Sequence, residues 1–169
     1  LGVVAAAAAL TACSSTNEAV NQALIEGAVG GIVAADCKIG RMTYWAANAT
    51  VPVYEISFRI VMTNVSSKPV TLSGDNFATT LDGTPIPPFN FSARDVGDAD
   101  IWRTYDSLTI RPGEERSVAL AYEISQPTYD SWYKSSRTVA VSFTCGNQRV
   151  TYTKNSRSDE ITVSDIETL

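Results

Sequence analysis

Alternation of apolar and polar residues is the feature that most restricts how this chain can fold. In the stretch PVYEISFRIVMTNV, apolar side chains recur at every second position and polar side chains lie between them. The apolar set is Tyr54, Ile56, Phe58, Ile60 and Met62, and the polar set is Glu55, Ser57, Arg59 and Thr63. Successive side chains of a strand point to opposite faces, so this pattern predicts a strand buried on one face and solvated on the other.

Two later stretches repeat this pattern. In ERSVALAYEIS, the residues predicted to face inward are Val118, Leu120, Tyr122 and Ile124. In TVAVSFTCGNQRVTYT, a two-residue turn at Gly146-Asn147 aligns the apolar residues of both arms, with the expected pairs Cys145/Gln148, Phe143/Val150 and Val141/Tyr152. A slip of one residue would send these side chains to opposite faces, so the register of this hairpin is well defined.

Turn residues separate the predicted strands. SSKP, LDGT and RPGEE contain the Pro and Gly residues that favour turns. The proline-rich segment PIPPFNF is predicted to be a loop or an edge strand, since proline cannot donate a ladder hydrogen bond. It begins a long loop expected over residues 85–106. Several short strands between turns predict an all-β, antiparallel β-sandwich over residues 37–154, followed by a tail over 155–169 with one short strand.

The first residues, LGVVAAAAALTACSS, form an apolar run that ends at Cys13. Residues 1–12 are too few to span a bilayer, which needs about 20 residues, but they suit the apolar region of a signal peptide. The tetrad Leu10-Thr11-Ala12-Cys13 resembles the bacterial lipobox. That resemblance implies lipid attachment to Cys13, cleavage before it, and anchoring to a membrane. Ser14 after the cysteine implies the outer membrane in a Gram-negative cell, or the outer face of the cell membrane in a Gram-positive one.

Residues 13–36 read as a polar tether followed by a short helix. Val20, Leu24, Ala28 and Ile32 recur at helical spacing, and Thr16 or Asn17 could cap the start. The glycines in GAVGG oppose this interpretation, because each costs about 1 kcal/mol relative to alanine inside a helix. The expected element is a helical tether below the sandwich.

The cysteine count suggests one bridge. If Cys13 carries lipid, Cys37 and Cys145 remain as an even pair in an exported domain, so a disulfide between them is expected. It would add about 4 to 5 kcal/mol in the chain-entropy model. The alternative, a catalytic or metal-binding pair, lacks a CxxC spacing and any histidine partner.

Charge and composition exclude several functions. The net charge of −5 disfavours nucleic-acid binding, which requires basic surfaces. Histidine is absent from the sequence, so a Ser-His-Asp or Cys-His catalytic site cannot be built. Ser131 and Lys134 match the S-x-x-K motif of penicillin-recognising enzymes, but the companion motifs are missing. We therefore expect a protein that is not an enzyme and needs no cofactor.

The runs VYEISFRIVMTNVSSKPVTLSGDNFATTLDGT and SLTIRPGEERSVALAYEIS resemble bacterial immunoglobulin-like domains of small secreted antigens and uncharacterised lipoproteins. The shared elements are an alternating strand ending in N-x-S-x-K-P-V-T-L, a phenylalanine strand with an Asp-Gly turn, and an L-x-P-G-E turn. The resemblance covers Arg41 to Tyr152. It implies an immunoglobulin-like sandwich and carries over no catalytic residues. The long loop and the Cys37/Cys145 pair depart from the family pattern.

Two groups of residues are candidate sites. A ligand or partner surface is expected from aromatic side chains in the predicted loops: Phe89, Phe91, Trp102, Tyr105 and Trp132. Three closely spaced carboxylates are weaker candidates for Ca²⁺, although they do not match the EF-hand pattern: Asp95, Asp98 and Asp100. Solvated loop charge is the alternative for the carboxylates, and core packing is the alternative for the aromatics.

These observations lead to one expected function and one alternative. The expected function is a lipid-anchored envelope protein whose immunoglobulin-like domain binds another envelope protein. The alternative is a domain that binds a small ligand or a glycan through loop aromatics.

Overall fold

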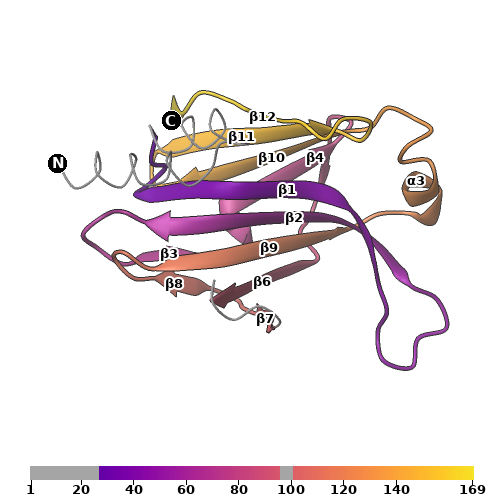
Figure 1. Ribbon diagram of the computed structural model, residues 1–169, viewed down its shortest axis with the longest axis horizontal. Helices are drawn as coiled ribbons and strands as arrows, with labels where there is room; N and C mark the ends of the chain where they lie inside the picture. Colours follow the sequence, from indigo (N-terminus) through magenta and orange to yellow (C-terminus); the bar gives the residue numbers. More distant parts are fainter. Residues whose placement is uncertain (1–26, 96–100) are drawn as a thin grey trace.

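The computed structural model describes residues 27–95 and 101–169, and it contains two antiparallel sheets packed face to face (Figure 1). The first sheet has the order β1 (Ile32–Tyr44), β2 (Val53–Asn64), β9 (Glu115–Glu123), β6 (Asn90–Asp95), β7 (Arg103–Thr104). The second has the order β12 (Ile161–Val163), β11 (Gln148–Asn155), β10 (Thr138–Cys145), β4 (Phe77–Leu81), β5 (Thr84–Ile86), with β13 (Glu167–Thr168) also paired to β11. The predicted all-β, antiparallel β-sandwich is confirmed.

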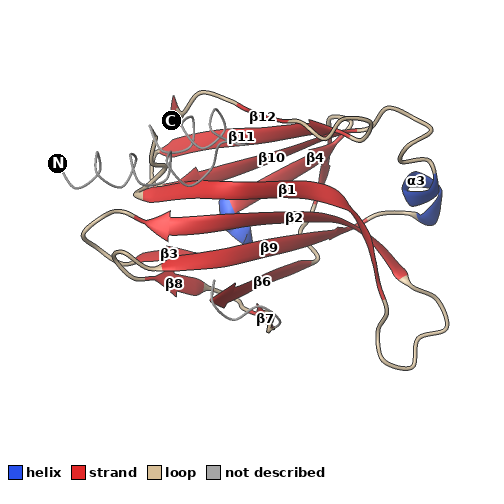
Figure 2. Ribbon diagram, in the orientation of Figure 1, coloured by secondary structure: helices blue, strands red, loops and turns tan. Residues whose placement is uncertain are grey.

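Short elements close the ends of the sandwich. β3 (Val70–Leu72) and β8 (Leu108–Ile110) form a separate two-stranded ribbon. A 3-10 turn, η1 (Gly74–Asn76), precedes β4, and the short helix α3 (Gln126–Asp130) follows β9 (Figure 2). Ser125 caps α3, because its side chain accepts a hydrogen bond from the Thr128 amide.

The core lies between the two sheets and follows the predicted alternation. Ile56, Phe58, Ile60 and Met62 of β2 are all at most 1% exposed. They pair with the inward residues of β9 in one register: Ile56/Tyr122, Phe58/Leu120 and Ile60/Val118. Burying one such side chain contributes about 1.5–3 kcal/mol, so this double row is a large part of what holds the first sheet to the second.

The β10–β11 hairpin has the predicted register. The cross-strand pairs are Cys145/Gln148, Phe143/Val150 and Val141/Tyr152. Gly146 adopts a φ of 61° in the turn, which a side chain would disfavour. The predicted LDGT turn is also present between β4 and β5, where Leu81 pairs with Thr84.

The N-terminal helix prediction is wrong where the structure describes it. The chain makes a tight turn at Gly30 and Gly31, with φ values of 58° and 85°, and β1 begins at Ile32. The sandwich therefore starts at Ile32 and not at Cys37. Tertiary pairing decides the outcome, since Ile32 and Ala34 are buried in alternation and β1 pairs with β2 along most of its length. The rest of the expected tether, including Cys13, lies outside the described residues.

Two other segments contain more strand than expected. Within the expected 85–106 loop, residues 90–95 form β6, which pairs with both β9 and β7. Thr84–Ile86 forms β5 at the sheet edge, as the prolines predict. The C-terminal tail contributes two short strands, β12 and β13, where one was expected.

The expected disulfide is not formed, because Cys37 and Cys145 are both free thiols. Cys145 ends β10 beside the Gly30 turn, with its Sγ 3.8 Å from the Gly30 carbonyl oxygen. Cys37 lies five residues further into β1 than Ile32, about 16 Å along an extended strand. The two thiols therefore lie at different levels of the sandwich. A disulfide needs Cα atoms within about 7 Å of each other, so this separation excludes a bridge.

We predict that Cys37 and Cys145 both react with a thiol reagent in the unfolded, unreduced protein, and that Cys145 reacts first in the folded protein. Burial raises the pKa of Cys37 to about 12, so little reactive thiolate is available. A Cys13→Ala variant restricts the count to these two thiols. Mass spectrometry that finds both cysteines in one disulfide-linked peptide would contradict the structure.

Candidate ligand-binding groove

The predicted aromatic surface is only partly correct. Trp132 is 1% exposed and Phe91 is 6% exposed, so both belong to the core and cannot contact a partner. The turn after α3 folds back through a hydrogen bond from the Trp132 amide to the Tyr129 carbonyl, and this places the indole in the core. The polar residues beside Trp132 in the sequence predict a surface position. Tertiary packing overrides this local signal.

Of the other three predicted aromatic residues, one packs against the core and two lie at the surface. Tyr105 is half-buried against the core, and its hydroxyl lies 3.4 Å from the Arg116 guanidinium. Phe89 is 50% exposed, and Trp102 is half-buried at the surface of the first sheet. Phe89 and Trp102 line the same hollow. These two are the predicted residues that the structure brings together.

The carboxylate candidates do not form a metal site within the described residues. Asp95 is the last residue of β6, while Asp98 and Asp100 lie outside the described ranges. No group of three or more Asp, Glu, Cys or His side chains in residues 27–95 and 101–169 could hold a metal ion.

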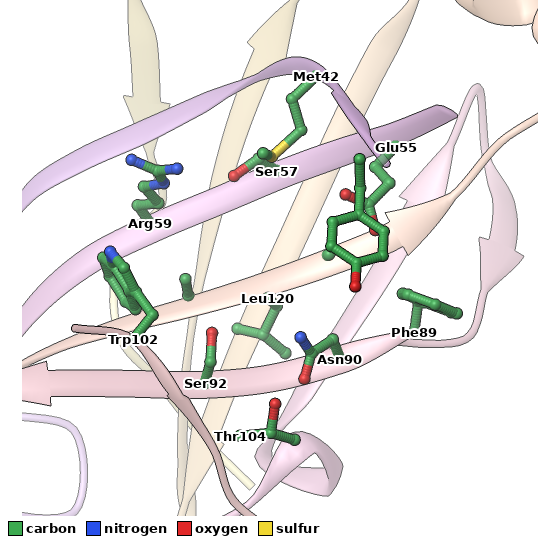
Figure 3. Close-up of a pocket in the computed structure, with 13 residues that line it drawn as sticks. Met42, Glu55, Ser57, Arg59, Phe89, Asn90, Ser92, Trp102, Thr104 and Leu120 are labelled. Carbon is green, nitrogen blue, oxygen red and sulfur yellow. The ribbon is translucent and has the colours of Figure 1, made fainter. Parts of the chain in front are cut away.

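The hollow is a groove of about 560 Å³ on the outer face of the first sheet (Figure 3). Its floor consists of small side chains from three adjacent strands: Ser57 of β2, Ala119 and Ala121 of β9, and Ser92 of β6. These residues alternate with the core residues of the same strands and so point away from the core. Because their side chains are short, the face is hollow.

Larger side chains form the walls of this groove. They are Met42 and Tyr44 of β1, Phe89 before β6, Trp102 before β7, and Thr104 of β7. β1 and β2 continue past the other strands and bend away as a long hairpin (Figure 1). The volume lies within the range of about 300–1,000 Å³ that is typical of small-molecule sites.

The two ends of the groove carry opposite charges. At the cationic end, Arg59 lines the groove, and its direct cross-strand neighbour Lys38 lines adjoining hollows that share Arg59 with it. At the acidic end, Glu55 is the cross-strand neighbour of Glu123. Figure 3 shows Arg59 beside Trp102 at one end and Glu55 at the other. Arg59 and Glu55 are four residues apart on β2, about 13 Å along the strand.

Glu55 is an unusual side chain for an outward strand position. It is 3% exposed, although its neighbours along β2 suggest a solvated face. Loss of hydration raises the pKa of Glu55, and the nearby Glu123 carboxylate raises it further. The groove therefore contains a carboxyl group that resists ionisation.

Asn90 adds an unsatisfied acceptor near the centre of the groove. Its Oδ1 atom is buried and has no hydrogen-bond partner among the described residues. Buried polar atoms normally have a partner, because an unpaired one costs about 1–3 kcal/mol. The Asn90 amide group therefore has an unmet hydrogen bond beside the groove.

The alternation in the sequence correctly predicts that Glu55, Ser57 and Arg59 point outward, but it predicts an ordinary solvated face there and not a groove. It missed the contributions of Met42, Tyr44 and Asn90. The detectable signal was the run of small residues at alternate positions in SVALAY, which predicts a shallow outer face once β9 is known to lie beside β2.

Comparisons with known proteins find similar solved structures but no family for this chain. No family model matches the sequence, and no curated protein matches it. Solved structures with similar folds include an uncharacterised β-sandwich protein from Clostridium difficile, with 15% identity over 72% of this chain and 83% of that chain and a TM-score of 0.45. The yjhA protein from Bacillus subtilis has 14% identity over 68% and 74% and a TM-score of 0.41. A protein from Archaeoglobus fulgidus has 12% identity over 79% and 98% and a TM-score of 0.35.

A membrane-spanning helix is not found among the described residues.

We predict that Glu55→Gln raises the melting temperature at about pH 7 and leaves it unchanged near pH 4. A raised pKa means that the folded state holds the proton more tightly than the unfolded state. Stability therefore falls as the pH rises from the ordinary carboxyl pKa through the raised value, and the loss persists above it.

Thermal unfolding of both proteins across this pH range measures the difference. Glu123→Gln serves as a comparison, because it removes only the secondary cause and should give a smaller gain at neutral pH. A Glu55→Gln protein that is less stable than wild type at neutral pH would show that the charged form is favoured.

Proposed function

We propose that this protein is a non-catalytic binding domain that holds a small ligand or glycan in the groove on its first sheet. The observation that carries the proposal is the combination of a hollow floor, aromatic walls and a few polar side chains in the lining. Tyr44, Phe89 and Trp102 offer ring faces for stacking, and Ser57, Ser92 and Asn90 offer hydrogen bonds. Sites for small molecules commonly combine apolar walls with a few directed polar groups.

The absence of histidine from the sequence supports a binding role over catalysis. Among the described residues, Glu55 is the carboxyl group in the groove lining, and general acid–base hydrolysis of a glycoside uses two carboxyl groups across the scissile bond. The proposed chemistry is therefore recognition without turnover.

The location that we propose is the cell envelope, with the domain tied to a membrane through lipid on Cys13. The lipobox-like tetrad and the apolar run before it support this location. A binding domain on the outer side of a membrane would meet wall or surface glycans directly.

A second candidate function is binding of an envelope protein through the β1–β2 hairpin. The end of β1 and the segment that joins it to β2 expose large apolar side chains: Tyr44 is 48% exposed, Trp45 59% and Val51 68%. Exposed apolar clusters of this kind often mark protein contacts. Co-purification of one envelope protein from crosslinked cells, lost in a Trp45→Ala variant, would support this function.

We predict that Trp102→Ala weakens binding to a glycan selected on an array by about tenfold or more, since the lost stacking is worth about 1.5 kcal/mol. Titration calorimetry of the purified full chain measures the affinity. Trp45→Ala is the matched control, because Trp45 is exposed but does not line the groove. Equal affinity of Trp102→Ala and wild type would place the binding site elsewhere.

We also predict that mass spectrometry of the mature protein from its native membrane finds an acylated N-terminal Cys13. A Cys13→Ala variant should appear in the soluble fraction. An unmodified peptide running through residues 10–16 would contradict the lipid anchor.

A further inference from the structure

We propose that the ligand of the groove is an acidic saccharide, whose carboxylate, sulfate or phosphate group binds between Lys38 and Arg59. This inference rests on the proposed function and specifies the class of ligand. It is drawn from the charge layout of the sheet, the polarity of the floor, and the position of the groove on a sheet face.

Lys38 and Arg59 form a like-charged cross-strand pair, which is destabilising in a sheet without compensation. Among the described residues, neither side chain forms an ion pair. Asp36 lines an adjoining hollow that shares Arg59 and Trp102 with the groove, and it is not within ion-pair distance of either cation. An anionic group bound between the two cations would remove the repulsion.

Trp102 holds the cationic end in place. The Cζ atom of Arg59 lies 5.5 Å from the centroid of the Trp102 ring, and that of Arg94 lies 5.0 Å from it. Both distances are within the range of about 6 Å for cation–π contacts. Arg59 is therefore positioned beside an aromatic surface, so a sugar ring on Trp102 would bring its acidic substituent to the guanidinium (Figure 3).

The rest of the groove suits a saccharide better than a peptide or a lipid. An extended peptide usually adds to a sheet edge, where backbone groups are free, whereas this groove lies on the face of paired strands. A lipid tail would cover the hydroxyl groups of Ser57 and Ser92 without giving them hydrogen-bond partners, whereas a sugar supplies such partners. At the acidic end, the Glu55 carboxyl group is suited to sugar hydroxyl donors, and Asn90 adds an amide group near the centre of the groove.

The test compares glycans of matched length on the purified full chain. The neutral probe is chitohexaose, the carboxylate probe is a hyaluronan hexasaccharide, and the sulfate probe is a heparin hexasaccharide, with an array of phosphorylated glycans beside them. We expect at least one acidic class to bind about tenfold or more tightly than the neutral probe. This preference should shrink between about 50 mM and 500 mM NaCl, because salt screens exposed charges.

Variants identify the residues responsible. Arg59→Gln and Lys38→Gln should each remove most of the acidic preference, and Arg59→Lys should keep part of it, since the charge remains but the planar fork is lost. Arg111→Gln and Lys68→Gln are matched controls, because both residues are exposed and do not line the groove.

The outcomes separate this inference from the proposed function. Equal or tighter binding of neutral glycans, reduced by Trp102→Ala, would overturn the acidic preference and leave the groove as a glycan site. An acidic preference unchanged in both Arg59→Gln and Lys38→Gln would also overturn the inference. If no array glycan binds, the inference and the glycan function both fail.

Discussion

The inward face of β2 is the contact on which the rest of this structure depends. Phe58 is fully buried, and its ring lies 6.0 Å from that of Phe77 and 5.8 Å from that of Tyr152, centroid to centroid. These contacts join the first sheet to β4 and β11 of the second. Since β2 pairs with β1 on one side and β9 on the other, packing of its inward residues also orients the outer face of three strands. The groove lies on the reverse side of this buried face of β2.

The groove combines features that work against stability. Short side chains on the floor leave space unfilled, Lys38 faces Arg59, and Glu55 faces Glu123. Glu55 is also deprived of water, which raises its pKa. Each feature is unfavourable in an empty sheet and favourable when a ligand supplies stacking, donors and an anionic group. Binding sites frequently combine such locally unfavourable features with an otherwise well packed scaffold.

Part of the site could be predicted from the sequence. The alternation placed Glu55, Ser57 and Arg59 on one outward face, and Phe89 and Trp102 were recognised as surface aromatics. The prediction of a surface position for Trp132 is wrong, because the residue lies among polar residues in the sequence but its indole is in the core. The expected disulfide rests on the number of cysteines. That number carries no information about how far apart Cys37 and Cys145 lie along the sandwich. Residues 30–35 contain apolar residues at both helical and strand spacing, so the sequence around Gly30 could not distinguish a helix from the start of β1.

The sequence by itself determined the antiparallel sandwich, the inward residues of β2 and β9, and the register of the β10–β11 hairpin. These properties follow from period-two alternation and from turn residues, which act over a few neighbouring positions. Only the tertiary structure decided where β1 begins, which aromatics are buried, and that small residues of β2, β9 and β6 line one groove with charged ends. Those properties depend on which strands become neighbours, and strand order is set by packing between segments that are far apart in the chain.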